Sequence, residues 1–193
     1  MKSISRRSFI QYSGTLITAA SLDKVSLFKS AAPKLSFSTL GCPDWPLDKI
    51  LDVAVANKYS GVEIRGIQRE MDLSKSPHFN SDANIKATKQ KFADKNLKIV
   101  GFGASAAMHH SGEAERTKAM DEAKRFLEIA DKAGCPYVRV FPNNFPKEVA
   151  KEKSMELMAA GLNDLAKFSK GSSAKVMMET HGDLVWVNDI VSV

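Results

Sequence analysis

Residues that could carry chemistry gather near the end of the sequence, where Glu179, Thr180, His181, Gly182 and Asp183 directly follow the apolar run 175–178. Carboxylate and imidazole groups are typical of active sites, in which they act as acids, bases or ligands. Side chains two residues apart on an extended segment point to the same side, so the first carboxylate and the imidazole can reach one pocket. The alternatives are a solvated carboxylate at a strand end and a histidine of a surface loop.

A second pair with the same spacing is Glu63 and Arg65, in the stretch GVEIRG. Their side chains also share one face of an extended segment. A carboxylate and a guanidinium so placed can form a clamp for a substrate or a structural ion pair, and the residues alone do not decide between the two.

The elements that must position these residues alternate along the chain. Short apolar runs typical of strands occur at residues 35–40, 61–66, 97–103, 136–142 and 174–180. Longer segments between them repeat apolar residues at helical spacing, and one of these, about 114–133, stops at Gly134 as helices often do. Strands that alternate with helices in this way predict βαβ units and a parallel sheet in an α/β fold.

Two closures of such a sheet are open. A doubly wound sheet requires a glycine-rich phosphate loop after an early strand, and Gly101-Phe102-Gly103 lacks the third glycine. A (β/α)₈ barrel requires polar residues at the C-terminal ends of successive strands, because its site is built there. This chain has such residues after every predicted strand, namely Ser38 and Thr39, Glu63 and Arg65, Ser105 with His109 and His110, Arg139 with Asn143 and Asn144, and Glu179 with His181. The pattern favours the barrel.

The composition is that of one globular domain, but the charge is uneven. Residues 1–34 carry a net charge of +5 out of +6 for the whole chain of 193 residues. The rest is nearly neutral, so we expect no nucleic-acid partner. The opening MKSISRRSFIQYSGTLITAASL, with the twin arginines Arg6 and Arg7, resembles a twin-arginine export signal, which predicts a periplasmic or exported protein; the alternative is a basic amphipathic first helix. Its apolar stretch is too short for a stable membrane span.

The two cysteines, Cys42 and Cys135, lie far apart in the sequence, without the close spacing of a zinc knuckle or a redox pair. We expect packed thiols. In an oxidising compartment a disulfide between them is the alternative.

Two stretches of the sequence are similar to a known family. FSTLGCPDWPLDKILDVAVANKYSGVEIRG near the start and VMMETHGDLVW near the end resemble the sugar phosphate isomerase/epimerase family of xylose isomerase-like TIM barrels, over residues 35–193. The resemblance implies a sugar or sugar derivative as the small-molecule substrate and an isomerase, epimerase or related lyase that moves a proton beside a carbonyl. It also implies a divalent metal, because a metal stabilises the charge of the enediolate.

The resemblance further assigns roles to residues. Glu179 matches the metal ligand of the family's fifth strand, which is also proposed to act as acid or base in some members. Its metal would be Mn²⁺ or Mg²⁺, or Co²⁺ or Zn²⁺ if imidazole joins the ligands. On the substrate side we place His181, Glu63, Arg65, Asn143 and His109, the last in a loop where family members often contact substrate; adjacent histidines are also commonly just exposed.

The family has eight strands, whereas residues 35–193 supply about five βα units, so we expect a partial barrel from a longer enzyme, with the remaining metal ligands beyond Val193. Two other functions stay open. One is an endonuclease IV-like DNA repair enzyme of the same superfamily, which would need a basic groove. The other is a non-catalytic, truncated remnant.

Overall fold

The computed structural model describes residues 33–193, in which five parallel strands form one sheet. The strands are β1 (Ser36–Ser38), β2 (Gly61–Ile64), β3 (Lys98–Ala107), β4 (Tyr137–Phe141) and β5 (Lys175–Met178). Their order in the sheet is the order of the sequence, and every neighbouring pair is parallel. The predicted leader, residues 1–34, lies almost wholly outside the described residues.

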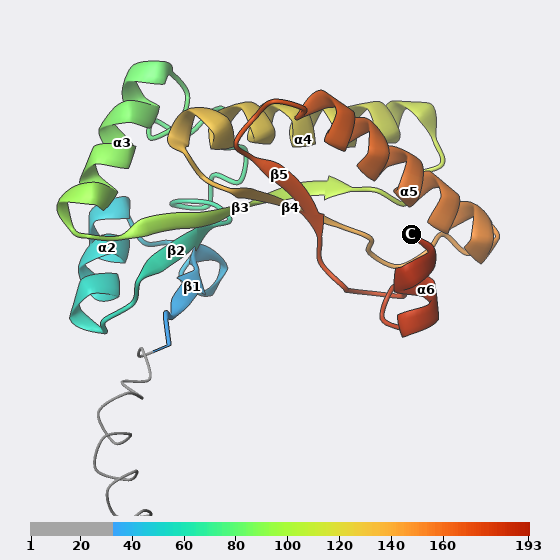
Figure 1. Ribbon diagram of the computed structural model, residues 1–193, viewed down its shortest axis with the longest axis horizontal. Helices are drawn as coiled ribbons and strands as arrows, with labels where there is room; N and C mark the ends of the chain where they lie inside the picture. Colours follow the sequence, from blue (N-terminus) through green and yellow to red (C-terminus); the bar gives the residue numbers. More distant parts are fainter. Residues whose placement is uncertain (1–32) are drawn as a thin grey trace, which may run out of the picture. The chain divides into compact units, whose positions relative to one another are not determined.

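Helices connect the strands, and Figure 1 shows them following one side of the curved sheet. They are α2 (Leu47–Ala56), α3 (Asp82–Asp94), α4 (Glu113–Ala133) and α5 (Lys151–Phe168), with the short η1 (Thr39–Gly41) after β1 and α6 (Val187–Ser192) near the C-terminus. The predicted helix over 114–133 is confirmed, and Gly134 ends it with the left-handed backbone that glycine favours (φ 69°). Among residues 33–193, no helix is both long and apolar enough to span a bilayer.

The core lies between the sheet and these helices. Strand residues that point toward the helices are apolar and buried, as Val62 and Ile64 of β2 and Val138 and Val140 of β4 illustrate. Because side chains alternate along a strand, the residues between them point to the other face, which we call the inner face. The α/β fold of a partial TIM barrel predicted from the sequence is therefore confirmed.

The predicted strands differ from the observed ones at their C-terminal ends. β3 runs four residues further than predicted, to Ala107, which carries Ser105 within the strand. β2 and β5 stop at Ile64 and Met178, so Arg65 and Glu179 each follow a strand directly. Both are still held in place, because the Arg65 amide donates to Thr39 Oγ1 (2.9 Å) and the Glu179 amide donates to the Val140 carbonyl (3.1 Å).

Both cysteines are buried free thiols, as the sequence predicted. Burial raises the pKa of the Cys135 thiol to about 11. This thiol is therefore protonated at neutral pH and packs as a small apolar side chain.

Candidate functional site

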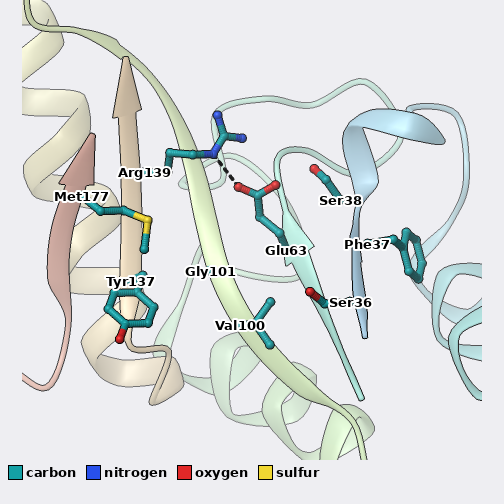
Figure 2. Close-up of a pocket in the computed structure, with 9 residues that line it drawn as sticks. All are labelled: Ser36, Phe37, Ser38, Glu63, Val100, Gly101, Tyr137, Arg139 and Met177. Atoms are coloured by element: carbon teal, nitrogen blue, oxygen red, sulfur yellow. Dashed lines mark hydrogen bonds and ion pairs between the residues drawn. The ribbon is translucent and has the colours of Figure 1, made fainter. Parts of the chain in front are cut away.

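The inner face of the sheet is polar, in contrast to the apolar face under the helices. Figure 2 shows that the Glu63 side chain of β2 extends over β3, near Gly101, and meets Arg139 of β4. A hollow of about 280 Å³ opens here, lined by Ser36, Phe37, Ser38, Glu63, Val100, Gly101, Tyr137, Arg139 and Met177. Barrel interiors are usually filled by branched apolar side chains. In this chain, the charged side chains of Glu63 and Arg139 lie among the residues that line the hollow.

Arg139 links three strands by two ion pairs. Its Nε donates to Glu63 Oε1 at 2.7 Å, and its Nη1 donates to Glu179 Oε2. The side chains of Arg139 and Glu63 are only 15% and 21% exposed, whereas Glu179 is 40% exposed. Charge-assisted hydrogen bonds in such a partly dry site are stronger than those at the surface, so Arg139 fixes the direction in which both carboxylates point.

Gly103 makes room for this arrangement. A Cβ atom added at this position would lie 2.6 Å from Arg65 Cδ and 2.9 Å from Arg139 Nη2. Any larger residue would therefore push against both arginine side chains. Gly103 is paired with Arg139 in the β3–β4 register, which brings the two guanidinium groups over the middle of the sheet.

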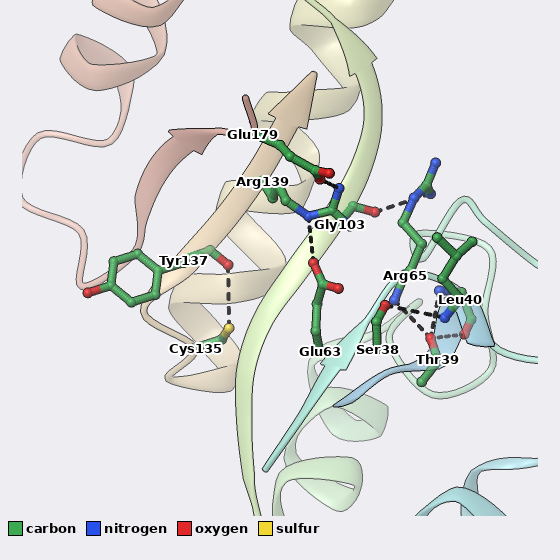
Figure 3. A network of polar contacts seen from close by, with 11 residues as sticks. Ser38, Thr39, Leu40, Glu63, Arg65, Gly103, Cys135, Tyr137, Arg139 and Glu179 are labelled. Carbon is green, nitrogen blue, oxygen red and sulfur yellow. Dashed lines mark hydrogen bonds and ion pairs between the residues drawn. The ribbon is translucent and has the colours of Figure 1, made fainter. Parts of the chain in front are cut away.

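Arg65 lies in the same layer but makes different contacts. Its Nη1 donates to the Gly103 carbonyl (3.2 Å) and its Nη2 donates to Ser105 Oγ (2.9 Å). Figure 3 shows this side chain beside the chain of ion pairs. Burial, and then the charge of Arg139, lower the pKa of Arg65, which nevertheless stays protonated at neutral pH.

Phe141 joins the arginines to the segment after β5. The guanidinium carbons of Arg139 and Arg65 lie 4.6 Å and 5.7 Å from the centre of its ring. The ring of His181 meets Phe141 edge to face, with centroids 5.7 Å apart. Phe141 thus offers its face to cations and packs beside the imidazole, as aromatic rings commonly do.

Asn143 and Asp183 hold two loops together. Asn143 has a left-handed backbone (φ 54°), and its carbonyl accepts a hydrogen bond from the Asp183 amide at 3.4 Å. The Asp183 carboxylate in turn accepts a hydrogen bond from the Phe145 amide at 2.7 Å. The observed contacts of Asn143 are thus those of its backbone, and they place the loop after β4 against the loop after β5.

The two histidines that follow β3 stack on each other, with ring centroids 4.4 Å apart. His109 Nδ1 is buried and has no hydrogen-bond partner within residues 33–193. Burial, and then the neighbouring His110, lower the pKa of His109. The amide of the preceding Met108 donates to the Phe141 carbonyl (2.9 Å), which fixes this loop at the end of β4.

The structure thus brings together four of the residues chosen from the sequence, Glu63, Arg65, Glu179 and His181, around Arg139 and Phe141. His109 and Asn143 lie in loops at the same edge of the sheet. The sequence placed Arg139 among the polar residues at the strand ends but did not predict it as a binding or catalytic residue, and it did not single out Phe141. The signal for them was the alternation in YVRVF, which places Tyr137, Arg139 and Phe141 on one face of β4.

The described residues do not by themselves fit a divalent metal. Across residues 33–193, no three side chains of the His, Cys, Asp or Glu type gather at one point. Glu179 is also engaged by a guanidinium, which competes with any cation for the same oxygen. Divalent metals in proteins take four or more ligands, so this donor set is too small.

Comparison with known proteins gives one family and a set of structural neighbours. The family described as xylose isomerase-like TIM barrel matches residues 51–189. No curated protein matches the chain significantly. Among solved structures, the IolI protein with a bound zinc atom has a TM-score of 0.63 at 19% identity, over 76% of this chain and 51% of its own.

Two further neighbours are named for their activity or their domain. D-psicose 3-epimerase with D-tagatose from Clostridium cellulolyticum H10 has a TM-score of 0.62 at 14% identity, over 83% of this chain and 60% of its own. A xylose isomerase domain protein from Planctomyces limnophilus has a TM-score of 0.55 at 15% identity, over 78% of this chain and 55% of its own. The chain therefore spans only about half to three fifths of these proteins, and at such identities the likeness concerns the fold.

Proposed function

The chain belongs to the xylose isomerase-like TIM-barrel family, and from this premise we propose that the protein is an isomerase or epimerase of a sugar or sugar derivative. The reaction removes a proton from the carbon beside a carbonyl group, so that the electrons of the C–H bond move onto the carbonyl oxygen as an enediolate. Return of the proton to the other face of the same carbon gives an epimer, and return to the neighbouring carbon gives an isomer. Sugar epimerases among the structural neighbours support this choice of reaction.

The observation that carries the proposal is the placement of Glu179. It lies directly after β5, at the C-terminal edge where barrel enzymes build their sites. Arg139 binds its Oε2 and thereby leaves Oε1 to take the substrate proton. We assign Glu179 the role of general base, a role that carboxylates commonly fill.

The positive charge of Arg139 has a second use in this reaction. The enediolate carries a negative charge that must be stabilised for the proton to leave, and a fixed cation at the edge of a partly dry site does so without reorganisation. Glu63 fixes Arg139 from the other side. His181 and Phe141, which pack together, form the adjoining wall for the sugar.

We also propose that the whole protein binds a divalent metal, with Glu179 as one ligand. A bound zinc atom in a structural neighbour supports this proposal. When bound, such an ion would act as a Lewis acid on the carbonyl oxygen. Residues 33–193 do not supply enough ligands to hold such an ion. Proton removal and stabilisation of the enediolate are therefore assigned here to Glu179 and Arg139.

Glu179→Gln tests the assignment. We expect the protein to exchange the hydrogen beside the carbonyl of a ketose, D-fructose or D-tagatose, for deuterium in D₂O, as followed by proton NMR. Glutamine can still accept the bond from Arg139 but is not basic, so exchange should slow by at least about a hundredfold.

The matched control is Glu128→Gln on α4, which removes one exposed carboxylate far from the inner face and should leave the rate unchanged. Unfolding curves confirm that both variants are folded. If Glu179→Gln exchanges deuterium at the original rate, Glu179 is not the base.

A further inference from the structure

Arg65 differs from the other charged side chains of the inner face in its partners. Glu63, Arg139 and Glu179 are joined by ion pairs, whereas within the described part of the chain Arg65 contacts no carboxylate. Both of its hydrogen bonds go to neutral acceptors, the Gly103 carbonyl and the Ser105 hydroxyl. A half-buried guanidinium without a counter-charge is costly, and proteins usually pair such a group.

The charge of Arg65 is incompletely compensated by its surroundings. Burial and the neighbouring Arg139 both lower the pKa of Arg65, while the carboxylates of Glu122 and Glu63 act in the opposite direction. Glu63 is already bound to Arg139. Glu122 accepts a hydrogen bond from the Ser105 amide, so neither carboxylate is in contact with Arg65.

The position of Arg65 is fixed before any ligand arrives. Its amide and that of Gly66 both donate to Thr39 Oγ1, which in turn donates to the Gly66 carbonyl at 2.7 Å. Its guanidinium is held by two hydrogen bonds and lies over the Phe141 ring. A group held in this way loses little freedom when it binds a ligand.

Free donors remain at this point of the site. A guanidinium has five N–H groups, of which Arg65 uses two within the described part of the chain. The exposed Ser105 hydroxyl accepts one of these bonds, so its own hydrogen is available to a ligand. Together they present several donors at the edge of the sheet where Glu179 also lies.

We propose that Arg65 and Ser105 bind the anionic group of the substrate, a carboxylate or a phosphate, and that the protein therefore binds an acidic sugar derivative more tightly than a neutral sugar. Guanidinium groups bind both kinds of anion through two parallel hydrogen bonds, which gives orientation as well as affinity. That the anionic ligand is a sugar derivative rests on the proposed function. The anion site itself stands on the contacts of Arg65.

Ligand binding tests the proposal without any turnover. The probes are D-glucuronate, which carries a carboxylate, D-glucose 6-phosphate, which carries a phosphate, and neutral D-glucose, each titrated into the protein and followed by calorimetry. The wild-type protein should bind at least one anionic probe more tightly than D-glucose. Arg65→Met should weaken that binding about tenfold or more, because a charge-assisted hydrogen bond is lost.

Two further variants complete the design. Arg125→Met removes an exposed guanidinium from α4 and should bind the probes as the wild type does. Ser105→Ala changes an exposed side chain and should fold even if Arg65→Met does not; it should weaken the anionic probe several-fold. A response to D-glucuronate alone identifies a carboxylate site, and a response to D-glucose 6-phosphate alone identifies a phosphate site.

The proposal is overturned if the wild type binds neither anionic probe better than D-glucose, or if the folded variants at Arg65 and Ser105 bind it as tightly as the wild type. These results are separate from the deuterium-exchange test. Anion binding that depends on Arg65, in a protein without exchange activity, supports the anion site and contradicts the proposed reaction. The reverse outcome leaves the reaction standing without the anion site.

Discussion

Arg139 is the residue on which the arrangement of the inner face depends. It pairs with a carboxylate from β2 and with another after β5, and its guanidinium lies 4.6 Å from the centre of the Phe141 ring. If a neutral residue replaced it, two partly buried carboxylates would face each other without a cation between them. Breaking such a pair costs more than the pair contributes, because the remaining charges are left uncompensated.

His109 gives a pH dependence whose sign follows from its surroundings. Burial and His110 hold its pKa below the ordinary value of 6.5 in the folded chain. As the pH falls through about 6.5, the unfolded chain therefore binds a proton first, and the folded state loses stability. We expect the urea midpoint to decrease between pH 7.5 and pH 5.5, and to decrease less in His109→Gln.

His78 provides the comparison for this measurement. Burial, and then Lys91, also lower its pKa, so a part of the acid sensitivity should remain in His109→Gln and be reduced separately in His78→Gln. An acid-induced shift in His109→Gln equal to that of the wild type would show that His109 titrates normally in the folded protein.

At the scale of the elements, the loops after β4 and β5 position the candidate base. Gly182 has a left-handed backbone (φ 62°), and an added Cβ would lie 2.4 Å from the Asn143 carbonyl oxygen. Backbone atoms cannot move aside as a flexible side chain can. The contact between the two loops therefore requires glycine at this position.

Gly182→Ala should therefore destabilise the protein by more than about 2 kcal/mol, the sum of backbone strain and the clash with Asn143. Gly171→Ala is the matched control, since Gly171 also has a positive φ (91°) but has open space around it. The control should show the strain alone, about 1 kcal/mol. Urea unfolding measures both values, and equal losses would mean that the loops separate without cost.

At the scale of the whole molecule, the five strands form an incomplete barrel within residues 33–193. Their inner face carries the charged layer, and the chain spans about half to three fifths of the length of its structural neighbours. A closed barrel of this class has eight strands.

The destination of the protein is also a property of the whole molecule, and we propose export through the twin-arginine route. The proposal is supported by the sequence motif with Arg6 and Arg7, which lie outside the described residues. Replacing both by lysine should abolish periplasmic accumulation in a bacterial host, as measured by cell fractionation and immunoblotting. Lys2→Gln, which leaves the arginines intact, should be exported. Equal export of the double variant would show that export does not depend on the twin arginines, and a wild-type protein that stays in the cytoplasm would favour the basic amphipathic helix instead.

The sequence by itself determined the alternation of strands and helices, the α/β class and the family resemblance. These depend on local periodicity and on short motifs, because an apolar run or a helical repeat reports burial over a few residues. It also predicted Glu63, Arg65, Glu179 and His181 near the ends of strands; Glu63 lies in β2, and the other three follow β2 or β5. The same alternation assigned each of them to a face of its strand.

Only the tertiary structure decided which of these side chains meet. Arg139 contacts Glu63 across 76 positions of sequence and Glu179 across 40, and Arg65 reaches Gly103 across 38. Such contacts depend on strand order and register, which place Arg139 beside Gly103 and Met177. Local periodicity fixes the face on which a side chain lies but not its neighbour on the next strand. The sequence therefore left undetermined the pairing of Arg139 and the lack of a carboxylate partner for Arg65 within residues 33–193.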